Sequence, residues 1–222
     1  NIHSGKDLFW RNRLEEMADF LADTNADIIG LQEVHQNRRL GYQAAFLAEA
    51  LHYSFAFAPA LPVADGHFGN ALLTRYPITQ TNVQFLHAGG EPRALLDVTI
   101  HSASNEPLNL LVTHCSLDQK SREKQWGRIR QMVDEKKDTP LILLGDFNSV
   151  QAQFDPILKD CAEATEQKKR STIVWLRKRL DYIFVSSHWR ILDYAVLPVK
   201  WSDHYPIMSI VELSASPRLH SQ

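Results

Sequence analysis

The chain has 222 residues with 24 Lys and Arg against 26 Asp and Glu, so its formal net charge is −2. A nearly neutral chain has no global positive field of the kind that drives non-specific nucleic-acid binding. The length fits a single domain, and the composition is that of a globular protein. Two cysteines, Cys115 and Cys161, cannot form a disulfide framework or a zinc cluster, and we expect both to be packing residues. No apolar run approaches the roughly 20 residues that span a membrane.

The first half of the chain alternates helix and strand patterns. Apolar residues spaced three and four apart predict an amphipathic helix over residues 11–24. A short apolar run that ends in Glu33 predicts a buried strand, and a second helix is expected at 43–52. The Pro, Gly and Asp residues between Pro59 and Gly69 predict a loop. Strands are then expected at 71–75, 79–86, 93–101 and 108–114.

In the second half, residues 118–136 carry apolar positions at helical spacing and are expected to pack on a sheet. The run 140–146 is apolar and ends in an acid, which again predicts a buried strand. Three more strands are expected at 180–185, 191–197 and 207–213, while residues 167–179 are irregular and basic. Without repeats or breaks in composition, the chain is predicted to be one mixed α and β domain over 1–222.

Polar residues gather where apolar strands stop, and sheet ends can bring such distant positions into one cleft. A carboxylate at the end of a buried strand is costly unless it is solvated, paired or bound to a cation. If strand pairing continues past Asp146, Asn148 lies on the same face of the strand, because residues two apart point the same way. The residues in question are Glu33, His114, Asp146, Asn148, Asp203 and His204.

Each motif taken alone also has a structural explanation. Glu33 fits an exposed strand end, and the turn at Asp146 fits a simple loop start. Asp181 fits an ion pair with the basic residues before it, and Asp203–His204 fits a hydrogen-bonded turn. The basic residues 168–170 and 177–179 fit either a rim for an anionic substrate or a solvated face.

Taken together and in order, the motifs resemble those of the endonuclease/exonuclease/phosphatase superfamily along nearly the whole chain. The resemblance rests on seven segments together with Arg122 and Gln125 of the expected helix. The segments are Asn1-Ile2-His3, Leu31-Gln32-Glu33-Val34, Gly69-Asn70-Ala71 through Arg75, Val112-Thr113-His114, Gly145-Asp146-Phe147-Asn148, Leu180-Asp181-Tyr182-Ile183-Phe184 and Ser202-Asp203-His204.

The resemblance implies an α/β fold, a four-layer sandwich of two packed mixed β-sheets flanked by helices. It implies a phosphoesterase that uses Mg²⁺ or Mn²⁺ and an activated water, with Glu33 as metal ligand and Asn1 and Asp203 beside the metal. Asp146 would orient or deprotonate the water, and Asn148 would bond the phosphoryl oxygens. His204, held by Asp181, and His114 would face the phosphate from two sides.

Further expectations concern the substrate contacts and the partners. Asn70 and Arg93 are hypothesised to contact the substrate, and the alternative is a structural amide and a surface Arg. The partner is a phosphate-ester substrate, nucleic acid is possible as a substrate but not favoured, and we expect a monomer. A non-catalytic domain that binds a phosphorylated ligand or lipid headgroup is the competing interpretation.

Two departures from the family pattern stand out. The family has an apolar strand before the Asn of its first motif, whereas this sequence starts at Asn1, so either the sequence is trimmed or the first strand is missing. Many relatives carry Thr-Phe-Pro before the Asp181 motif, where this chain has Thr172-Ile173-Val174-Trp175. Substrate specificity therefore cannot be transferred, and without an initial Met the localisation stays open.

Overall fold

The computed structural model describes residues 1–214. The helices among them are η1 (His3–Gly5), α1 (Leu14–Thr24), α2 (Gln43–Leu51), α3 (Gln119–Glu135) and α4 (Cys161–Ala164). The first strands are β1 (Ile28–Asn37), β2 (Gly41–Tyr42), β3 (Ser54–Val63), β4 (Gly66–Thr74), β5 (Ile78–Phe85) and β6 (Ala94–His101). The later strands are β7 (Pro107–His114), β8 (Leu141–Asp146), β9 (Leu158–Asp160), β10 (Asp181–Ser186), β11 (Trp189–Val196) and β12 (Ile207–Leu213).

Two sheets carry the fold. The first sheet has the order β2-β1-β4-β3 and is antiparallel throughout. The second sheet has the order β5-β6-β7-β8-β10-β9 and is mixed, because β7 and β8 run parallel and are joined by the crossover helix α3. Strands β11 and β12 form a separate antiparallel pair.

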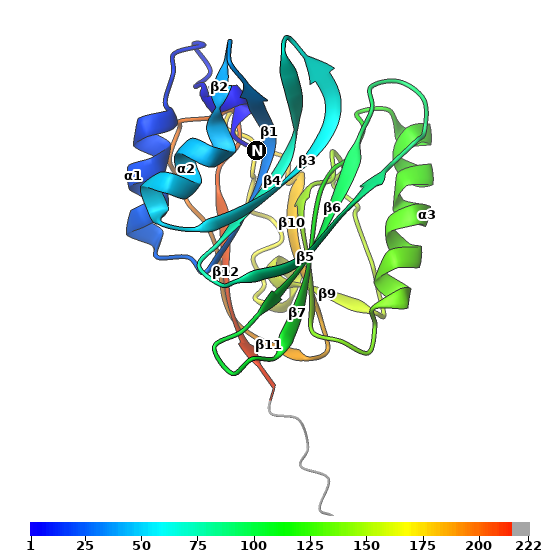
Figure 1. Cartoon of the computed structure of the whole chain (residues 1–222). Coiled ribbons are helices and arrows are strands. Elements are labelled where there is room, and N and C mark those ends of the chain that lie inside the picture. The colour runs from blue at the N-terminus through cyan, green and yellow to red at the C-terminus, as the bar shows by residue number, and fades with distance from the viewer. Residues whose placement is uncertain (215–222) are drawn as a thin grey trace, which may run out of the picture.

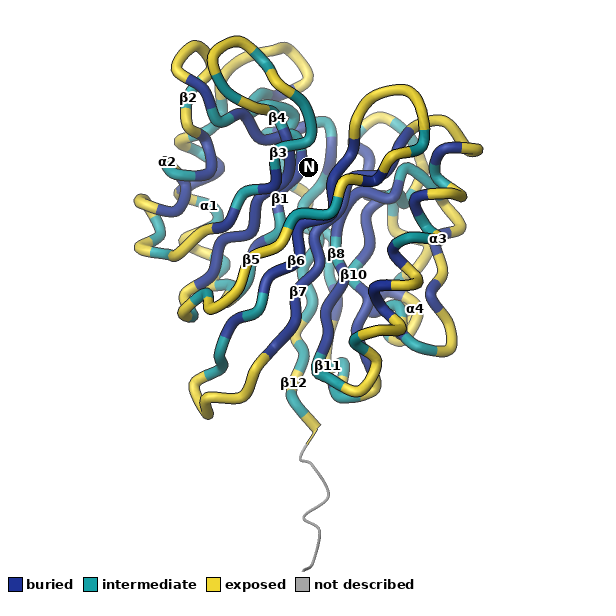
Figure 2. Tube along the Cα trace, turned by 45° about the vertical axis from the view of Figure 1, so that its right-hand side comes forward, coloured by how far each residue is buried: buried dark blue, intermediate teal, exposed yellow. Residues whose placement is uncertain are grey.

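The two sheets pack face to face between two outer helical layers, as Figure 1 shows. Helices α1 and α2 cover the first sheet, and α3 covers the second. The apolar residues between the sheets come from β3, β4, β6 and β7, among them Ala58, Leu72, Leu96 and Leu110. In Figure 2 the central strands are buried while the exposed stretches lie mainly in the loops at their ends. The expected α/β four-layer sandwich is confirmed.

Most predicted elements are present with ends shifted by a few residues, but the predicted loop at Pro59–Gly69 is wrong. These residues form the end of β3 and the start of β4, a hairpin with a tight turn at 64–65. The error has a physical cause: β3 lies at the edge of the first sheet, where proline is tolerated, and a bulge between Pro59 and Leu61 absorbs the irregularity.

Close packing of the two sheets depends on a glycine of β1. A Cβ atom at Gly30 would lie 2.3 Å from Leu144 Cδ1 of β8, closer than any real contact. Gly30 lies three residues before Glu33, and Leu144 lies two residues before Asp146. The contact therefore sets the close spacing of β1 and β8 just before the residues of the expected site.

An apolar cavity of about 450 Å³ lies beside this contact. Its walls include Ile28 and Ile29 of β1, Ile207 and Val211 of β12, and side chains of α1. Within residues 1–214, strand β12 pairs with β11 alone. The Ile2 N–H donates to the Gln32 carbonyl of β1 at 3.0 Å. Among the described residues, no helix has both the length and the apolarity needed to cross a membrane.

Candidate active site

Residues far apart in sequence meet where β7, β8 and β10 approach the start of the chain. His114 is the last residue of β7 and Asp146 the last of β8, and the two are register partners in the second sheet. Asp181, the first residue of β10, pairs with Asp146 on the other side. The predicted clustering of polar residues at strand ends follows from this register, since parallel β7 and β8 end together.

The carboxylate of Asp146 lies at the centre of the cluster and is buried. Its Oδ1 accepts the backbone N–H of Asn148 at 2.8 Å, and its Oδ2 lies 3.2 Å from Asn1 Nδ2. The same Oδ2 lies 3.5 Å from His114 Nε2 and 3.7 Å from His204 Nε2. Burial, reinforced by the negative charge of Asp181, raises the pKa of Asp146 to about 6.

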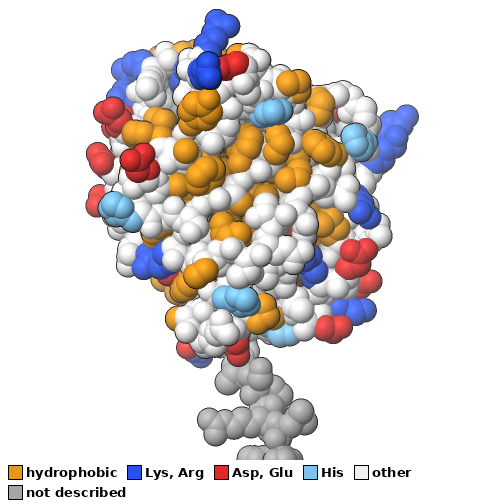
Figure 3. All heavy atoms as spheres, in the orientation of Figure 1, with side chains coloured by type: hydrophobic (Ala, Val, Ile, Leu, Met, Phe, Trp, Pro, Cys, Tyr) orange, Lys and Arg blue, Asp and Glu red, His pale blue; other side chains and the backbone are white. Residues whose placement is uncertain are grey.

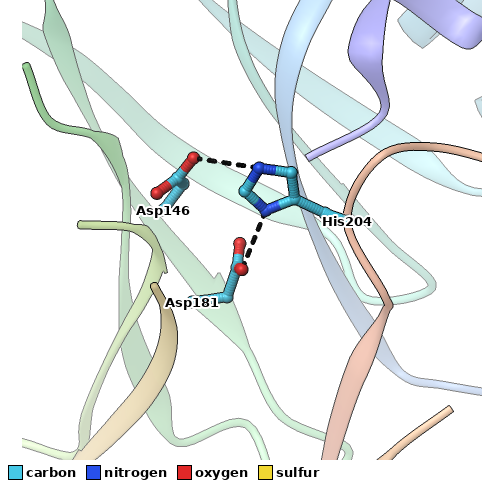
Figure 4. A group of neighbouring side chains, drawn as sticks. All are labelled: Asp146, Asp181 and His204. Carbon is cyan, nitrogen blue, oxygen red and sulfur yellow. Dashed lines mark hydrogen bonds and ion pairs between the residues drawn. The ribbon is translucent and has the colours of Figure 1, made fainter. Parts of the chain in front are cut away.

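His204 joins Asp146 and Asp181, as Figure 4 shows. Its Nδ1 hydrogen-bonds Asp181 Oδ2 at 2.9 Å, while its Nε2 faces Asp146. Burial by itself would lower the pKa of His204, but attraction to the Asp181 carboxylate outweighs burial and raises it. Conversely, burial would raise the pKa of Asp181, and the His204 charge lowers it. The Asp181 carboxylate therefore favours the charged imidazolium form of His204.

His114 is in the opposite charge state. Burial, reinforced by the positive charge of Arg93, lowers the pKa of His114 well below its usual value. Arg93 Nη1 lies 3.0 Å from His114 Nδ1, and a guanidinium can only donate. Nδ1 must then be the unprotonated nitrogen, so Nε2 carries the hydrogen and directs it toward Asp146 Oδ2. One neutral and one charged imidazole thus flank the same carboxylate.

Oxygen-bearing side chains adjoin Asp146 near the start of the chain: those of Glu33, Asn1 and Asp203. Glu33 is in a bulge of β1 with a positive φ of 59°, which turns its side chain out of the strand alternation. Asn1 Nδ2 lies 2.8 Å from Glu33 Oε1 and 3.2 Å from Asp146 Oδ2. Asp203 is linked to Asn1 through the Ser202 hydroxyl, which lies 2.9 Å from Asn1 O and 3.2 Å from Asp203 Oδ1.

This donor set fits a hard divalent cation. The amide N–H group of Asn1 bridges two carboxylates, which is the position that a positive charge would take. Asn1 Oδ1 accepts the backbone N–H of His3 at 3.0 Å, so the amide oxygen could face the same point only if that hydrogen bond broke. The residues present therefore match the oxygen-rich surroundings that Mg²⁺ and Mn²⁺ prefer.

A second group of ligand-type atoms overlaps the first. One atom each from Asp146, Asp181 and His204 lies within 4.8 Å of the others. Both nitrogens of His204 are already directed at carboxylates, and a histidine must lose its proton to bind a metal. Since the pKa of His204 is raised, we favour the side of Asp146 that faces Glu33 as the cation position.

Asn148 is close to Asp146, but not for the predicted reason. Strand β8 ends at Asp146, and Asn148 adopts a left-handed conformation with a φ of 49° instead of continuing the strand. Its Nδ2 donates to the Cys115 carbonyl at 2.9 Å, which leaves the second amide hydrogen for a ligand. A cavity of about 420 Å³ lies next to Asn148 and is lined by Arg122, Ser149 and Lys178.

The hypothesised substrate contacts lie one layer further out. Arg93 is buried, faces His114 and forms an ion pair with Glu91 at 2.9 Å. Asn70 Nδ2 donates to the carbonyl of Ala94, the residue next to Arg93. Both side chains therefore belong to the surroundings of His114, and Arg93 is not a surface residue. Cys115 and Cys161 are free and buried, as expected of packing residues.

Two supporting hydroxyls were not predicted. Thr172 Oγ1 accepts the backbone N–H groups of Leu180 and Asp181, and Ser202 ties the Asp203 turn to Asn1. Neither has a periodic signal, because each acts across a loop. Within the basic run, Arg179 pairs with the partly buried Asp160 and Lys168 pairs with Glu163, so these two cations serve the fold. Arg177 and Lys178 are exposed.

The sequence of this chain matches a known protein family. Residues 1–204 match the model of the Endonuclease/Exonuclease/phosphatase family. The chain belongs to the endonuclease/exonuclease/phosphatase family. The uncharacterized protein YbhP of Escherichia coli is 29% identical over 238 residues, which cover 96% of this chain and 94% of YbhP.

Solved structures of the endonuclease/exonuclease/phosphatase fold are similar along most of the chain. A family protein from Beutenbergia cavernae has a TM-score of 0.81 at 22% identity, covering 96% of this chain and 70% of that one. The mannosyl-6-phosphatase Bt3783 of Bacteroides thetaiotaomicron gives 0.75 at 19%, covering 90% and 91%. D. rerio TDP2, complexed with a single-strand DNA product, gives 0.77 at 20% and covers 96% of each chain. At these identities the likeness shows the fold.

Proposed function

We propose that the chain is a divalent-metal-dependent phosphoesterase that hydrolyses a phosphodiester or phosphomonoester by in-line attack of an activated water. The observation that carries the proposal is the buried Asp146 carboxylate, flanked by one neutral and one charged imidazole. A domain that only binds phosphate has no need of a carboxylate there, because a buried negative charge repels phosphate. A water that attacks phosphorus needs such an acceptor for its proton.

The residues take the following roles in this proposal. Asp146 orients the water and accepts its proton, and the second amide hydrogen of Asn148 bonds a phosphoryl oxygen. His204, charged through Asp181, and the Nε2–H of His114 stabilise negative charge on the phosphate and its leaving oxygen. Asn70 and Arg93 contact the substrate from the His114 side. No covalent intermediate with the protein is needed.

Mg²⁺ or Mn²⁺ would be held by Glu33, with Asn1 and Asp203 beside it. When bound, such an ion supplies a Lewis acid that neutralises phosphate charge. The bridging position of the Asn1 amide between Glu33 and Asp146 supports this placement.

The decisive experiment is hydrolysis of bis(p-nitrophenyl) phosphate and of p-nitrophenyl phosphate with Mg²⁺, Mn²⁺ or EDTA. We expect metal-dependent release of nitrophenol that is lost with EDTA and in Asp146→Ala. The diester to monoester ratio narrows the substrate class. Absence of turnover on these esters and on nucleic-acid, phospholipid and inositol-phosphate esters would favour the alternative, a non-catalytic domain for a phosphorylated ligand. Size-exclusion chromatography tests the expected monomer.

A further inference from the structure

Exposed apolar side chains gather around the mouth of the candidate site. Five of them form what we call the apolar rim: Phe9, Trp10, Leu117, Val150 and Trp175. Four are about two-thirds exposed or more: Phe9 at 76%, Trp10 at 66%, Leu117 at 78% and Trp175 at 65%. Large apolar residues that cluster at one end of a molecule indicate an interaction surface, whereas scattered ones do not.

Each rim residue lies in a loop that also positions the site. The Trp10 ring lies 4.9 Å from the His3 ring, and the His3 N–H donates to Asn1 Oδ1. Leu117 follows His114 by three residues, and Val150 follows Asn148 by two.

Trp175 is next to Val174, whose N–H donates to the Asp203 carbonyl at 2.9 Å. Because the residues next to these loops converge on Asp146, we infer that the loops border the same opening and that the rim lies on the site side of the molecule.

Positive charge accompanies the apolar tips. Arg11 lies over the Phe9 ring at 5.1 Å, and Lys6 lies over the Trp10 ring at 5.2 Å. Arg177 and Lys178 follow Trp175 and are exposed, with no ion pair among the described residues. In the view of Figure 3, Lys and Arg side chains also project from the upper edge of the molecule. Arg11 is paired with Asp7 at 2.8 Å, whereas Lys6, Arg177 and Lys178 form no ion pair within the described part of the chain. Cations therefore accompany the rim although the whole chain carries −2.

We propose that the apolar rim docks the site end of the molecule onto an anionic lipid bilayer. Trp side chains favour the headgroup level of a bilayer, aliphatic tips enter the acyl boundary, and Lys and Arg attract anionic lipid. Single-stranded nucleic acid would use Phe9, Trp10 and Trp175 as stacking platforms, but Leu117 and Val150 have no π face to offer a base. The aliphatic members thus favour lipid.

The test is binding to vesicles, which needs no catalytic activity. We expect the purified chain to cosediment with vesicles of 70% phosphatidylcholine and 30% phosphatidylglycerol, and its tryptophan emission to shift to the blue. Binding should weaken with salt and be much weaker on pure phosphatidylcholine. The triple variant Phe9→Ser/Leu117→Ser/Trp175→Ser should lower the apparent vesicle affinity at least tenfold. Arg177→Glu/Lys178→Glu should remove the preference for anionic vesicles.

Two controls make the result specific. Phe55→Ser/Leu192→Ser removes exposed apolar residues of β3 and β11, outside the rim, and should bind vesicles like the wild type. Circular dichroism confirms that each variant is folded. A wild type that ignores anionic vesicles, or a triple variant that binds as well as the wild type, would overturn the proposal. Loss of oligo(dT) binding in the triple variant, without any vesicle binding, would assign the rim to nucleic acid.

Discussion

The carboxylate of Asp181 holds the imidazole of His204 through a 2.9 Å hydrogen bond and keeps it charged in a buried place. In Asp181→Asn the attraction is gone and burial then lowers the His204 pKa. Activity that requires the protonated imidazole should then fall off at a lower pH than in the wild type. The basic limb of the kcat/KM profile therefore shifts to lower pH. A profile of the variant between pH 5 and 10 that overlays the wild type would show that His204 does not act as a cation.

Asp146→Asn should separate activity from stability. The folded pKa of Asp146 is about 6 and exceeds the usual aspartate value of 3.8, so protonation favours the native state. The contribution of Asp146 to the stability of the metal-free protein is therefore lost as pH rises from about 4 through 6. Removing the buried charge should raise Tm at pH 7.5 in EDTA, by about 2–4 °C for each kcal/mol gained in the free energy of unfolding. Hydrolysis should be abolished. A lower Tm in differential scanning calorimetry would contradict this.

Arg93→Ala should lower kcat/KM by roughly ten- to a hundredfold, because the guanidinium fixes the hydrogen of His114 on Nε2 and is proposed to contact the substrate. Arg93→Lys keeps the charge but not the planar fork and should recover only part of the loss. Asn70→Ala tests the neighbouring amide in the same assay. An unchanged kcat/KM for either alanine variant would remove that residue from the site.

Glu33→Gln should weaken metal binding, because a hard cation loses a charged oxygen ligand. We expect the Mn²⁺ concentration for half-saturation to rise roughly tenfold or more, measured by titration calorimetry independently of turnover. Glu49→Gln, on the exposed surface of α2, is the matched control and should bind like the wild type. Equal affinities for the two variants would place the cation elsewhere, with the Asp146, Asp181 and His204 group the next candidate.

Gly30→Ala should destabilise the protein by about 1–3 kcal/mol through overpacking against Leu144. The double variant Gly30→Ala/Leu144→Ala makes room for the new methyl group and should cost less than the sum of the two single variants. Urea denaturation of all four proteins gives the coupling energy. Strict additivity would mean that the sheets adjust freely at this contact.

The sequence predicted those parts of the fold that depend on local pattern. Apolar strands that stop at His114 and Asp146 placed these side chains at sheet ends, and helical spacing located α1 and α3. The strand predicted to end at Glu33 instead continues to Asn37, with Glu33 in a bulge inside it. The hairpin of β3 and β4 was missed because Pro59 and Gly69 are typical of loops, and only an edge position makes them acceptable in a strand.

The finer geometry of the site depends on the register of the strands, which local sequence patterns do not predict. Arg93 reaches His114 because β6 pairs with β7 so that Leu95 faces Thr113. The bulge that turns Glu33 and the left-handed turn at Asn148 are local conformations that tertiary contacts stabilise. Thr172 and Ser202 act across loops, where no periodicity guides prediction.

The site is divided between the two sheets: Glu33 belongs to the first, and His114, Asp146 and Asp181 belong to the second. Neither sheet alone carries all of these residues, so the proposed activity depends on the two sheets staying packed against each other. A small separation of the sheets would disrupt the geometry of the site while every strand kept its hydrogen bonds. The proposed hydrolytic activity should accordingly be lost on heating or in mild denaturant before the secondary structure melts, together with the near-ultraviolet circular dichroism signal.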